Sequence, residues 1–266
     1  MPSPTTVAQV AAYLETIAPL PLQESYDNAG LLVGDPATPV TGVLTTLDCT
    51  EEIVAEAVAR GCNLVVAHHP IVFRGLKRFN GTDYVERTII RAIREGVAIY
   101  AIHTNLDNVR FRGVNERIAR TLGLENLRLL APKNEEATVG SGMLGELPQP
   151  LAEPQFLRLL RDRLLTGVVR HTPLLGQPVR TVALCGGAGG FLLGRARAAG
   201  AQAFVTADYK YHEFFDANGE IVICDVGHYE SEQFTTQLLA EVLSEEFTTF
   251  AVLCTQRNTN PVRYFV

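Results

Sequence analysis

Two adjacent histidines, His68 and His69, follow an apolar segment whose composition is typical of a buried strand. Pro70 comes next and ends the predicted strand, so both imidazoles are expected at its carboxyl end. Histidine is the commonest protein ligand for borderline metals and the side chain most easily recruited for proton transfer near neutral pH. In open α/β sheets, ligands bind beyond the carboxyl ends of the strands. The pair therefore predicts a metal or catalytic site at this edge of a sheet.

Two further predicted strands, over 97–102 and 220–224, are followed by residues of the same chemical kind. Asp107 lies shortly after the first strand, and His228 and Glu232 lie after the second. Because His228 and Glu232 are four residues apart, one turn of helix would place them on the same face. A single histidine at a strand end is more often a hydrogen-bonded surface residue than a ligand. Its recurrence with carboxylates at equivalent strand ends favours metal binding.

The candidate metal ligands are three imidazoles and two carboxylates, His68, His69, Asp107, His228 and Glu232. A catalytic zinc usually takes three protein ligands, so five suit a pair of divalent ions about 3.5–4 Å apart with one bridging carboxylate. We expect Glu232 to bridge, because a carboxylate on a helix can face both ions. Imidazole and carboxylate ligands without thiolate allow Zn, Fe, Mn, Co or Ni alike.

Other polar residues are candidates for supporting roles. His103, Asp208 and His212 are predicted to support the ligands or to transfer protons. Arg74 and Lys77 follow the double histidine within ten residues. They predict an electropositive rim that attracts an anionic substrate, and a solvated basic loop is the simpler alternative.

A glycine-rich run, Gly186 to Gly190, follows a predicted strand and opens a predicted helix, as in dinucleotide-binding sites. However, Leu192 stands where that fingerprint needs a third glycine or alanine. The acidic residue that should follow a second strand is missing unless Asp208 supplies it. The run therefore favours a tight backbone turn that lines the site over a nucleotide cofactor site.

The composition is that of an ordinary globular protein, with 266 residues, 47% of them hydrophobic and 20% charged. The net charge of −6 gives no electrostatic footprint for nucleic acid or for an anionic membrane. No apolar run approaches the roughly 20 residues that span a bilayer, and the first six residues lack the basic start of a signal peptide. The five cysteines are odd in number and scattered, which indicates reduced thiols. We therefore expect a cytoplasmic protein.

Strands and helices alternate over 42–122 and again over 180–254, which predicts βαβ units and a parallel sheet. Three strands with two intervening helices occur twice, so we expect two similar α/β lobes. Residues 1–125 would form the first lobe, completed by 230–266, and residues 126–229 the second. If the lobes face each other, their strand ends would share one site.

Seven motifs in this order resemble the Nif-three-like family, also known as GTP cyclohydrolase I type-two homologues and as YbgI-like dinuclear metal centre proteins. The resemblance covers almost the whole chain, and one departure is Ala207, where many members have glycine. The motifs are Asp27–Gly34, Ala67–Phe73, His103–Asp107, Cys185–Gly190, Thr206–His212, Gly227–Glu232 and Asn260-Pro261.

The resemblance implies two α/β lobes of the Nif-three-like fold, with a dinuclear metal centre in the cleft between them and a ring-shaped homohexamer. The family's metal ligands fall on the same five residues, from His68 to Glu232. The family label suggests a metal-dependent hydrolase acting on a small anionic or nucleotide-like substrate. The alternative is a ring-forming metal-binding or regulatory protein without enzymatic activity, and neither nucleic acid nor membrane is an expected partner.

Overall fold

The computed structural model describes residues 4–265. Residues 1–3, which begin the segment considered for a signal peptide, lie outside the described residues, as does residue 266. The contacts between Cα atoms divide the chain into two compact units, Met1–Leu106 with Thr235–Pro261 and Asp107–Phe234 with Val262–Val266. The sequence predicts lobe boundaries after residues 125 and 229, and these boundaries stay a prediction.

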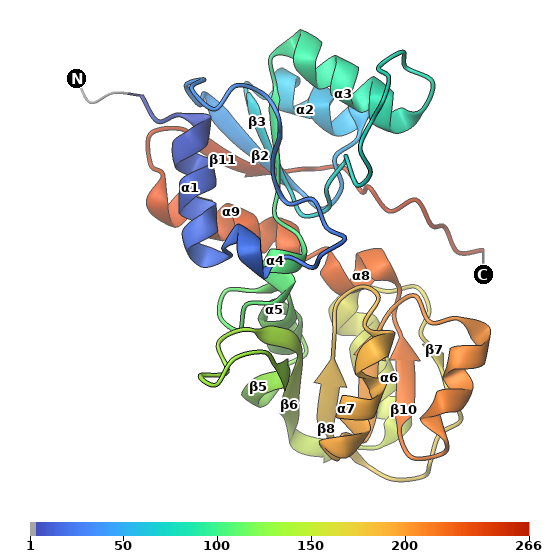
Figure 1. The fold of residues 1–266 in the computed structure, drawn as a ribbon. Coiled ribbons are helices and arrows are strands. Elements are labelled where there is room, and N and C mark those ends of the chain that lie inside the picture. Colours follow the sequence, from blue (N-terminus) through green and yellow to red (C-terminus); the bar gives the residue numbers. More distant parts are fainter. Residues whose placement is uncertain (1–3, 266) are drawn as a thin grey trace. The chain divides into compact units, whose positions relative to one another are not determined.

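The first unit contains a sheet with the strand order β1-β4-β3-β2-β11 (Figure 1). β2, β3, β4 and β11 run parallel, and β1 pairs with β4 in the antiparallel sense. Helices α2 and α3 cover one face, and α1 and α9 cover the other. The strands are β1 (Gly30–Val33), β2 (Gly42–Thr46), β3 (Leu64–Ala67), β4 (Ala98–Ala101) and β11 (Ala251–Cys254). The helices are α1 (Val7–Ile17), η1 (Leu20–Leu22), α2 (Glu51–Ala59), α3 (Tyr84–Glu95), α4 (Thr104–Asp107) and α9 (Thr235–Glu246).

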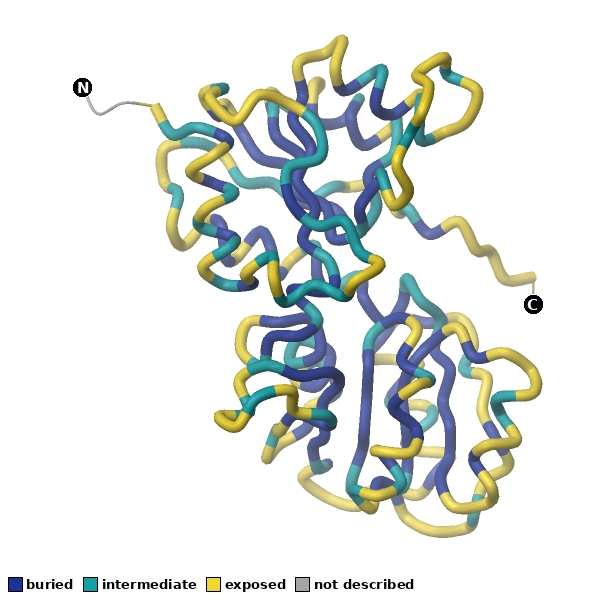
Figure 2. Tube along the Cα trace, viewed as in Figure 1, coloured by how far each residue is buried: buried dark blue, intermediate teal, exposed yellow. Residues whose placement is uncertain are grey.

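The apolar sequences of the central strands follow from this layering. Every residue of β2, β3 and β4 is buried, as expected for parallel strands that are covered on both faces (Figure 2). Leu44, Val65 and Ile99 from these strands pack with Ile53 of α2 and Ile89 of α3 in one core cluster. The carboxyl ends of the three strands are thereby held in fixed positions, and the candidate ligands follow two of them.

The second unit contains a sheet with the strand order β5-β6-β8-β9-β10-β7. β8, β9 and β10 run parallel, and the other three strands pair in the antiparallel sense. The strands are β5 (Glu125–Pro132), β6 (Gly140–Leu151), β7 (Arg170–His171), β8 (Val179–Leu184), β9 (Ala203–Thr206) and β10 (Val222–Asp225). The helices are α5 (Val114–Thr121), α6 (Glu153–Leu164), η2 (Gly190–Leu192), α7 (Leu193–Ala198), η3 (Tyr211–Ala217) and α8 (His228–Glu232).

The two sheets confirm the predicted α/β class and the internal repeat, because β2-β3-β4 and β8-β9-β10 are each three neighbouring parallel strands. The predicted parallel pairing holds for these central strands, and antiparallel strands are added at the edges, among them β5 and β6 over residues 125–151. After β10 the chain forms two helices, α8 and α9, and the boundary between the units falls between them, at residues 234 and 235.

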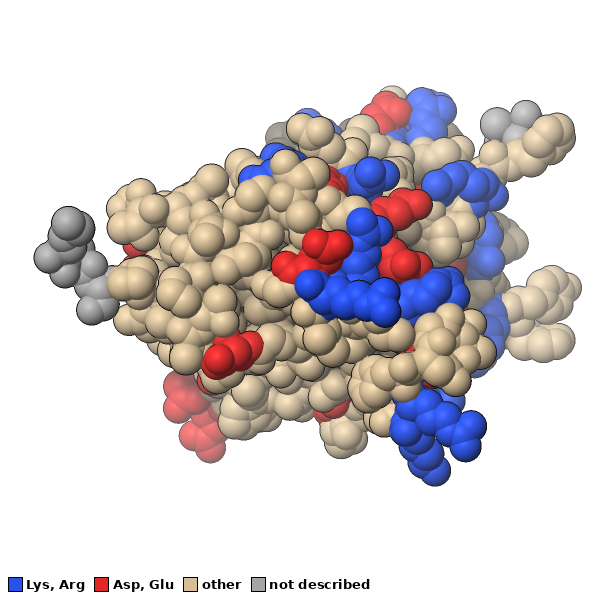
Figure 3. Space-filling view, turned by 90° about the horizontal axis from the view of Figure 1, so that it is seen from above, with Lys and Arg blue, Asp and Glu red and all other residues tan. Residues whose placement is uncertain are grey.

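The face of the first unit in Figure 3 carries basic and acidic side chains side by side. Between α3 and α2, Arg87 Nε lies 2.9 Å from Glu51 Oε2. This face is therefore not a uniformly cationic surface, in line with the net charge of −6. Among residues 4–265, no helix has both the length and the apolar character that crossing a bilayer requires.

Glu56 lies on α2 and forms hydrogen bonds with the segment that follows β11. Its carboxylate accepts hydrogen bonds from Thr255 Oγ1 at 2.6 Å, from the Gln256 amide at 2.9 Å and from Arg60 Nη1 at 2.7 Å. Burial raises the pKa of this carboxyl group, but the three donors outweigh burial and hold the pKa below its ordinary value of 4.5. The ionised form of Glu56 is therefore the form that stabilises the fold.

We expect Glu56→Gln to lower the free energy of unfolding by about 1–3 kcal/mol at neutral pH, because it removes hydrogen bonds to a charged acceptor. Since the folded-state pKa lies below the unfolded-state value, this stabilisation is present above the unfolded-state pKa and is lost as the pH falls through the folded-state pKa. The difference from the wild type should therefore shrink in acid. Urea unfolding at neutral pH and in acid measures the free energy of unfolding of both proteins. Glu52→Gln is the control, because the side chain of Glu52 is 76% exposed. Equal losses in the two variants would contradict the assignment.

Candidate metal centre

Two neighbouring strands deliver three histidines to one place in the first unit. His68 and His69 follow β3 directly, and His103 lies two residues after β4. The two strands are parallel and paired, so their carboxyl ends meet. Ring nitrogens of the three histidines all lie within 4.8 Å of one another. Such a cluster can bind a metal ion, and it includes His103, which the sequence placed among the supporting residues.

The two adjacent histidines are both fixed through Nδ1. His68 Nδ1 lies 2.8 Å from the carbonyl oxygen of Ile102, which can only accept a hydrogen bond, so Nδ1 carries the proton. His69 Nδ1 lies 2.8 Å from Asp48 Oδ1. Asp48 is held in turn by Thr259, whose hydroxyl donates to Oδ2 at 2.7 Å. In both rings Nδ1 is engaged in a hydrogen bond, so Nε2 is the ring nitrogen that could bind a metal.

His103 is fixed in the same way by a buried carboxylate. Its Nδ1 lies 2.7 Å from Asp27 Oδ1, and the side chain of Asp27 is 0% exposed. The Thr104 amide donates to Asp27 Oδ2 at 3.0 Å, and the Thr104 hydroxyl donates to the same oxygen. Burial raises the pKa of Asp27, but the hydrogen bonds outweigh it and hold the pKa well below its usual value of 3.8. Asp27 is therefore ionised and holds the proton of His103 on Nδ1.

The second unit supplies an imidazole between two carboxylates. His228 begins α8 and Glu232 ends it, and His228 Nε2 lies 3.0 Å from Glu232 Oε2, which confirms that the two share a helix face. His228 Nδ1 lies 2.7 Å from Asp208 Oδ2. Burial lowers the pKa of His228, but the hydrogen bonds to Asp208 and Glu232 outweigh it and raise the pKa to about 11. A metal ion at Nε2 would have to replace the proton on that nitrogen.

Asp107 brings a second carboxylate close to Glu232 in this unit. An oxygen of each lies within 4.8 Å of the other, and Glu232 is only 3% exposed. Both charges add to the effect of burial in raising the pKa of Cys185, one of five free cysteines. Asn115 Nδ2 donates to the carbonyl of Asp107 at 3.1 Å, which fixes the backbone there. Two carboxylates this close favour a cation beside them.

The glycine-rich run lines this part of the second unit, as the sequence predicted. Gly187 adopts a φ of +57°, and a Cβ on it would lie 2.6 Å from Glu232 Oε1 and 3.1 Å from His228 Cε1. Its amide donates to Ser231 Oγ at 3.0 Å. Glu232 and His228 can therefore occupy their positions only because Gly187 has no side chain.

The remaining sequence candidates lie in exposed segments. Arg74 and Lys77 belong to the exposed loop between β3 and α3. His212 lies on η3, where its ring is 5.2 Å from the ring of Tyr211 and 6.5 Å from that of Phe215. The structure thus gives His212 aromatic neighbours, whereas His103 and Asp208 directly contact or support predicted ligands.

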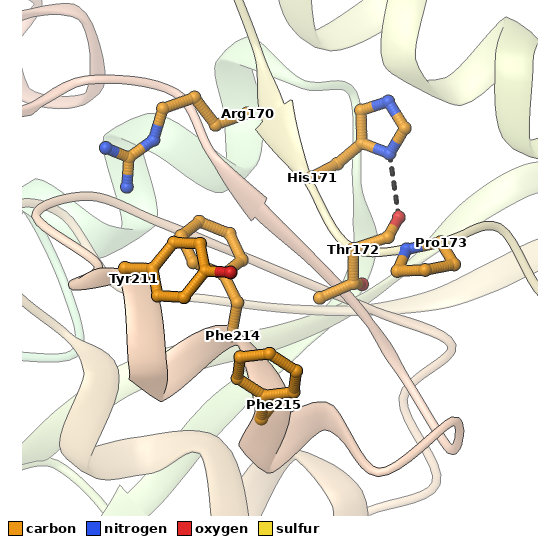
Figure 4. A pocket seen from close by; sticks show the side chains of 7 residues that line it. All are labelled: Arg170, His171, Thr172, Pro173, Tyr211, Phe214 and Phe215. Carbon is orange, nitrogen blue, oxygen red and sulfur yellow. Dashed lines mark hydrogen bonds between the residues drawn. The ribbon is translucent and has the colours of Figure 1, made fainter.

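An aromatic pocket of about 470 Å³ lies on the second unit (Figure 4). Tyr211, Phe214 and Phe215 line one side of it together with Arg170, whose guanidinium carbon lies 5.1 Å from the centroid of the Phe214 ring. Arg170 Nη2 donates to Asp225 Oδ2 at 2.8 Å. The amide of Tyr209, the residue after Asp208, donates to the same oxygen at 3.0 Å. The pocket wall and the backbone that carries Asp208 are therefore tied to one carboxylate.

Sequence reasoning gave neither Asp48 nor Asp27 a supporting role. A usable signal existed for Asp48, because it follows the carboxyl end of β2 as His68 follows that of β3. For Asp27 the sequence offers only a turn composition, since the residue precedes β1 and approaches His103 through the fold.

The model of the family Duf34/NIF3 (NGG1p interacting factor 3) matches residues 5–261 of the chain. The chain belongs to the DUF34/NIF3 family. This membership and the two-sheet α/β architecture confirm the resemblance and the fold class that the sequence predicts.

Relatives and solved structures of this family align along nearly the full length. A protein of Lactococcus lactis named GTP cyclohydrolase 1 type 2 homolog is 34% identical over 248 residues, 93% of this chain and 95% of the relative. One of the same name from Clostridium acetobutylicum is 28% identical over 264 residues, 97% of this chain and 98% of the relative. The crystal structure of Staphylococcus aureus hypothetical protein SA1388 has a TM-score of 0.91 at 28% identity and covers 99% of this chain and 100% of that one.

We expect Gly187→Ala to destabilise the second unit by about 1–3 kcal/mol, because the residue would be strained at a positive φ and its Cβ would collide with Glu232. Gly194→Ala is the matched control. Gly194 lies inside α7 with open space around the Cβ position and no positive φ, so alanine should raise stability by about 0.5–1 kcal/mol. Urea unfolding of the full chain measures both variants. A Gly187→Ala protein as stable as the wild type would show that the turn does not need glycine.

Proposed function

We propose that this DUF34/NIF3 chain binds two divalent metal ions and that the ligands are His68, His69, Asp107, His228 and Glu232. The observation that carries the proposal is common to four histidines of the two units. In His68, His69 and His228 of this set, and in the supporting His103, an oxygen is hydrogen-bonded to Nδ1. Nε2 is then the ring nitrogen that can face a metal, and in His228 the metal would replace the proton that Nε2 shares with Glu232. Metal-ligating histidines typically have this arrangement, with a carboxylate or a carbonyl at the other ring nitrogen.

The donor chemistry of each unit supports the proposal. The first unit offers imidazoles, whose rings are held at centroid distances of 5.0–5.3 Å. The second unit offers Asp107 and Glu232, whose like charges repel each other unless a cation lies between them. Nitrogen and carboxylate oxygen donors together suit a divalent transition metal, and no thiolate is needed.

Two divalent ions would polarise a substrate bond and lower the pKa of a water ligand. The residues around them have separate tasks in the proposal. Asp48 and Asp208 keep the rings of His69 and His228 in place. Asp27 holds the proton of His103 on Nδ1, so that Nε2 of His103 is the atom that supports a ligand or takes part in proton transfer.

For the reaction we propose hydrolysis of a small anionic or nucleotide-like substrate, with Arg74 and Lys77 attracting its negative charge. Two features support this: the donor set, and the name GTP cyclohydrolase 1 type 2 homolog that relatives carry. A screen of nucleotides and phosphoesters with Zn, Mn, Fe, Co and Ni tests it. If the metal-loaded protein turns over none of these nucleotides and phosphoesters, the result would favour the regulatory alternative.

We expect the full chain, loaded with zinc and desalted, to retain about two equivalents of metal. His69→Ala and His228→Ala should each lower this content, because each removes a ligand from one unit. His171→Ala is the control, since His171 is exposed on β7 and lies outside the proposed set. Elemental analysis provides the measurement. Less than one equivalent, unchanged by His69→Ala, would refute the metal site.

We expect Asp48→Asn and Asp208→Asn to weaken metal affinity about 10- to 100-fold, although neither removes a ligand. Each replaces the charged acceptor at the Nδ1 of a ligating histidine. Competition against a coloured chelator measures the affinity. Asp162→Asn, whose side chain on α6 is 63% exposed, should leave it unchanged. Affinities that are equal for all three variants would mean that the carboxylates do not position the rings.

A further inference from the structure

Tyr26 and Phe73 form an exposed aromatic pair beside the histidine cluster of the first unit. Their ring centroids are 6.2 Å apart with an interplanar angle of 36°, and the ring of Phe73 is 6.2 Å from the ring of His103. Tyr26 is 62% exposed and Phe73 is 45% exposed. Aromatic residues bury large areas when they stabilise a fold, so an exposed pair next to candidate ligands calls for another explanation.

The loop of Phe73 is anchored without the help of its ring. Ile71 is buried, and Val72 and Leu76 pack against the core cluster of the first unit. Phe73 lies outside that cluster, between the anchored residues Val72 and Leu76. The backbone therefore presents Phe73 to the outside while its neighbours hold the loop.

Hydrogen bonds connect the pair to the residue that fixes His103. Asn28 Nδ2 donates to the carbonyl of Val72 at 2.6 Å, next to Phe73. The Asn28 amide donates to Asp27 Oδ1 at 2.7 Å, and that oxygen also holds His103 Nδ1. Tyr26 precedes Asp27 in the same turn. Both aromatic residues thus adjoin residues that are fixed relative to His103, so the pair is organised in advance of binding.

The segment that carries Phe73 is cationic. Residues 71–82 contain Arg74, Lys77 and Arg78 and no acidic residue. All three cations are exposed. An aromatic surface beside a cationic loop is the combination that binds nucleotides, where bases stack on aromatic rings and phosphates pair with arginine or lysine.

We propose that Tyr26 and Phe73 stack against the planar base of a nucleotide-class ligand and that Arg74 pairs with its phosphate. The proposal rests on the proposed function in one respect, because the ligand would present its reacting part to the metal held beside His103. It adds recognition of the planar base to the proposed function and assigns that recognition to Tyr26 and Phe73.

The test is a calorimetric titration of the full chain with guanosine 5′-monophosphate, guanosine and ribose 5-phosphate. Phe73→Leu should weaken binding of the nucleotide and of guanosine about tenfold and leave ribose 5-phosphate unaffected, because only the stacked base is lost. Arg74→Gln should weaken the two phosphates and spare guanosine. Phe79→Leu is the control, since Phe79 is 57% exposed in the same segment.

Two results would overturn the proposal. In the first, ribose 5-phosphate binds the wild type as tightly as the nucleotide does. In the second, Phe79→Leu weakens nucleotide binding as much as Phe73→Leu does. Zinc content, measured on the same samples, separates this proposal from the metal site. Two retained equivalents without base-dependent binding would refute only the aromatic pair, and base-dependent binding without retained zinc would refute only the metal site.

Discussion

The hydrogen bond at Nδ1 of each histidine is the interaction on which the candidate centre depends. A neutral imidazole can present either ring nitrogen, and the hydrogen bond that one nitrogen makes decides which of them faces a ligand. Here a backbone carbonyl holds His68, and carboxylates hold His69, His103 and His228. The choice of ligand atom is therefore made by the fold before any ligand arrives. A site built in this way loses little side-chain entropy on binding.

This arrangement concentrates negative charge, which a fold of this size must accommodate. Asp27 is buried beside His103, and Glu232 is buried close to Asp107. Buried carboxylates are costly unless they are hydrogen-bonded or paired with a cation. Asp27 accepts hydrogen bonds from Thr104 and His103, and Glu232 Oε2 lies 3.0 Å from His228 Nε2. The fold thus gives both buried carboxylates nitrogen donors that offset the cost of burial.

The strand ends explain how much of the site the sequence could predict. Candidate ligands that follow parallel strands lie at the carboxyl edge of their sheet, so His68 and His69 in the first sheet and His228 in the second were predictable from strand positions alone. The partner at each Nδ1 depends on strand register instead. Thr46 of β2 pairs with Ala67 of β3, which brings Asp48 and His69, each two residues further on, next to each other. No local pattern encodes that pairing. The edge strand β5 was missed for a related reason, because its charged residues hide the alternation, and it pairs with the glycine-rich β6.

The segment around Thr259 has a consequence for the order in which the protein matures. Its hydroxyl holds Asp48, which in turn holds His69, although Thr259 lies 211 residues after Asp48 in the chain. The second unit is nearly continuous, from Asp107 to Phe234, whereas the first also needs Thr235–Pro261. During synthesis the second unit can thus be nearly complete while the first still lacks β11 and the support for His69. The order of synthesis therefore separates two events. The pair His68-His69 is made early, but its hydrogen-bond support is complete only after the C-terminal segment has been made.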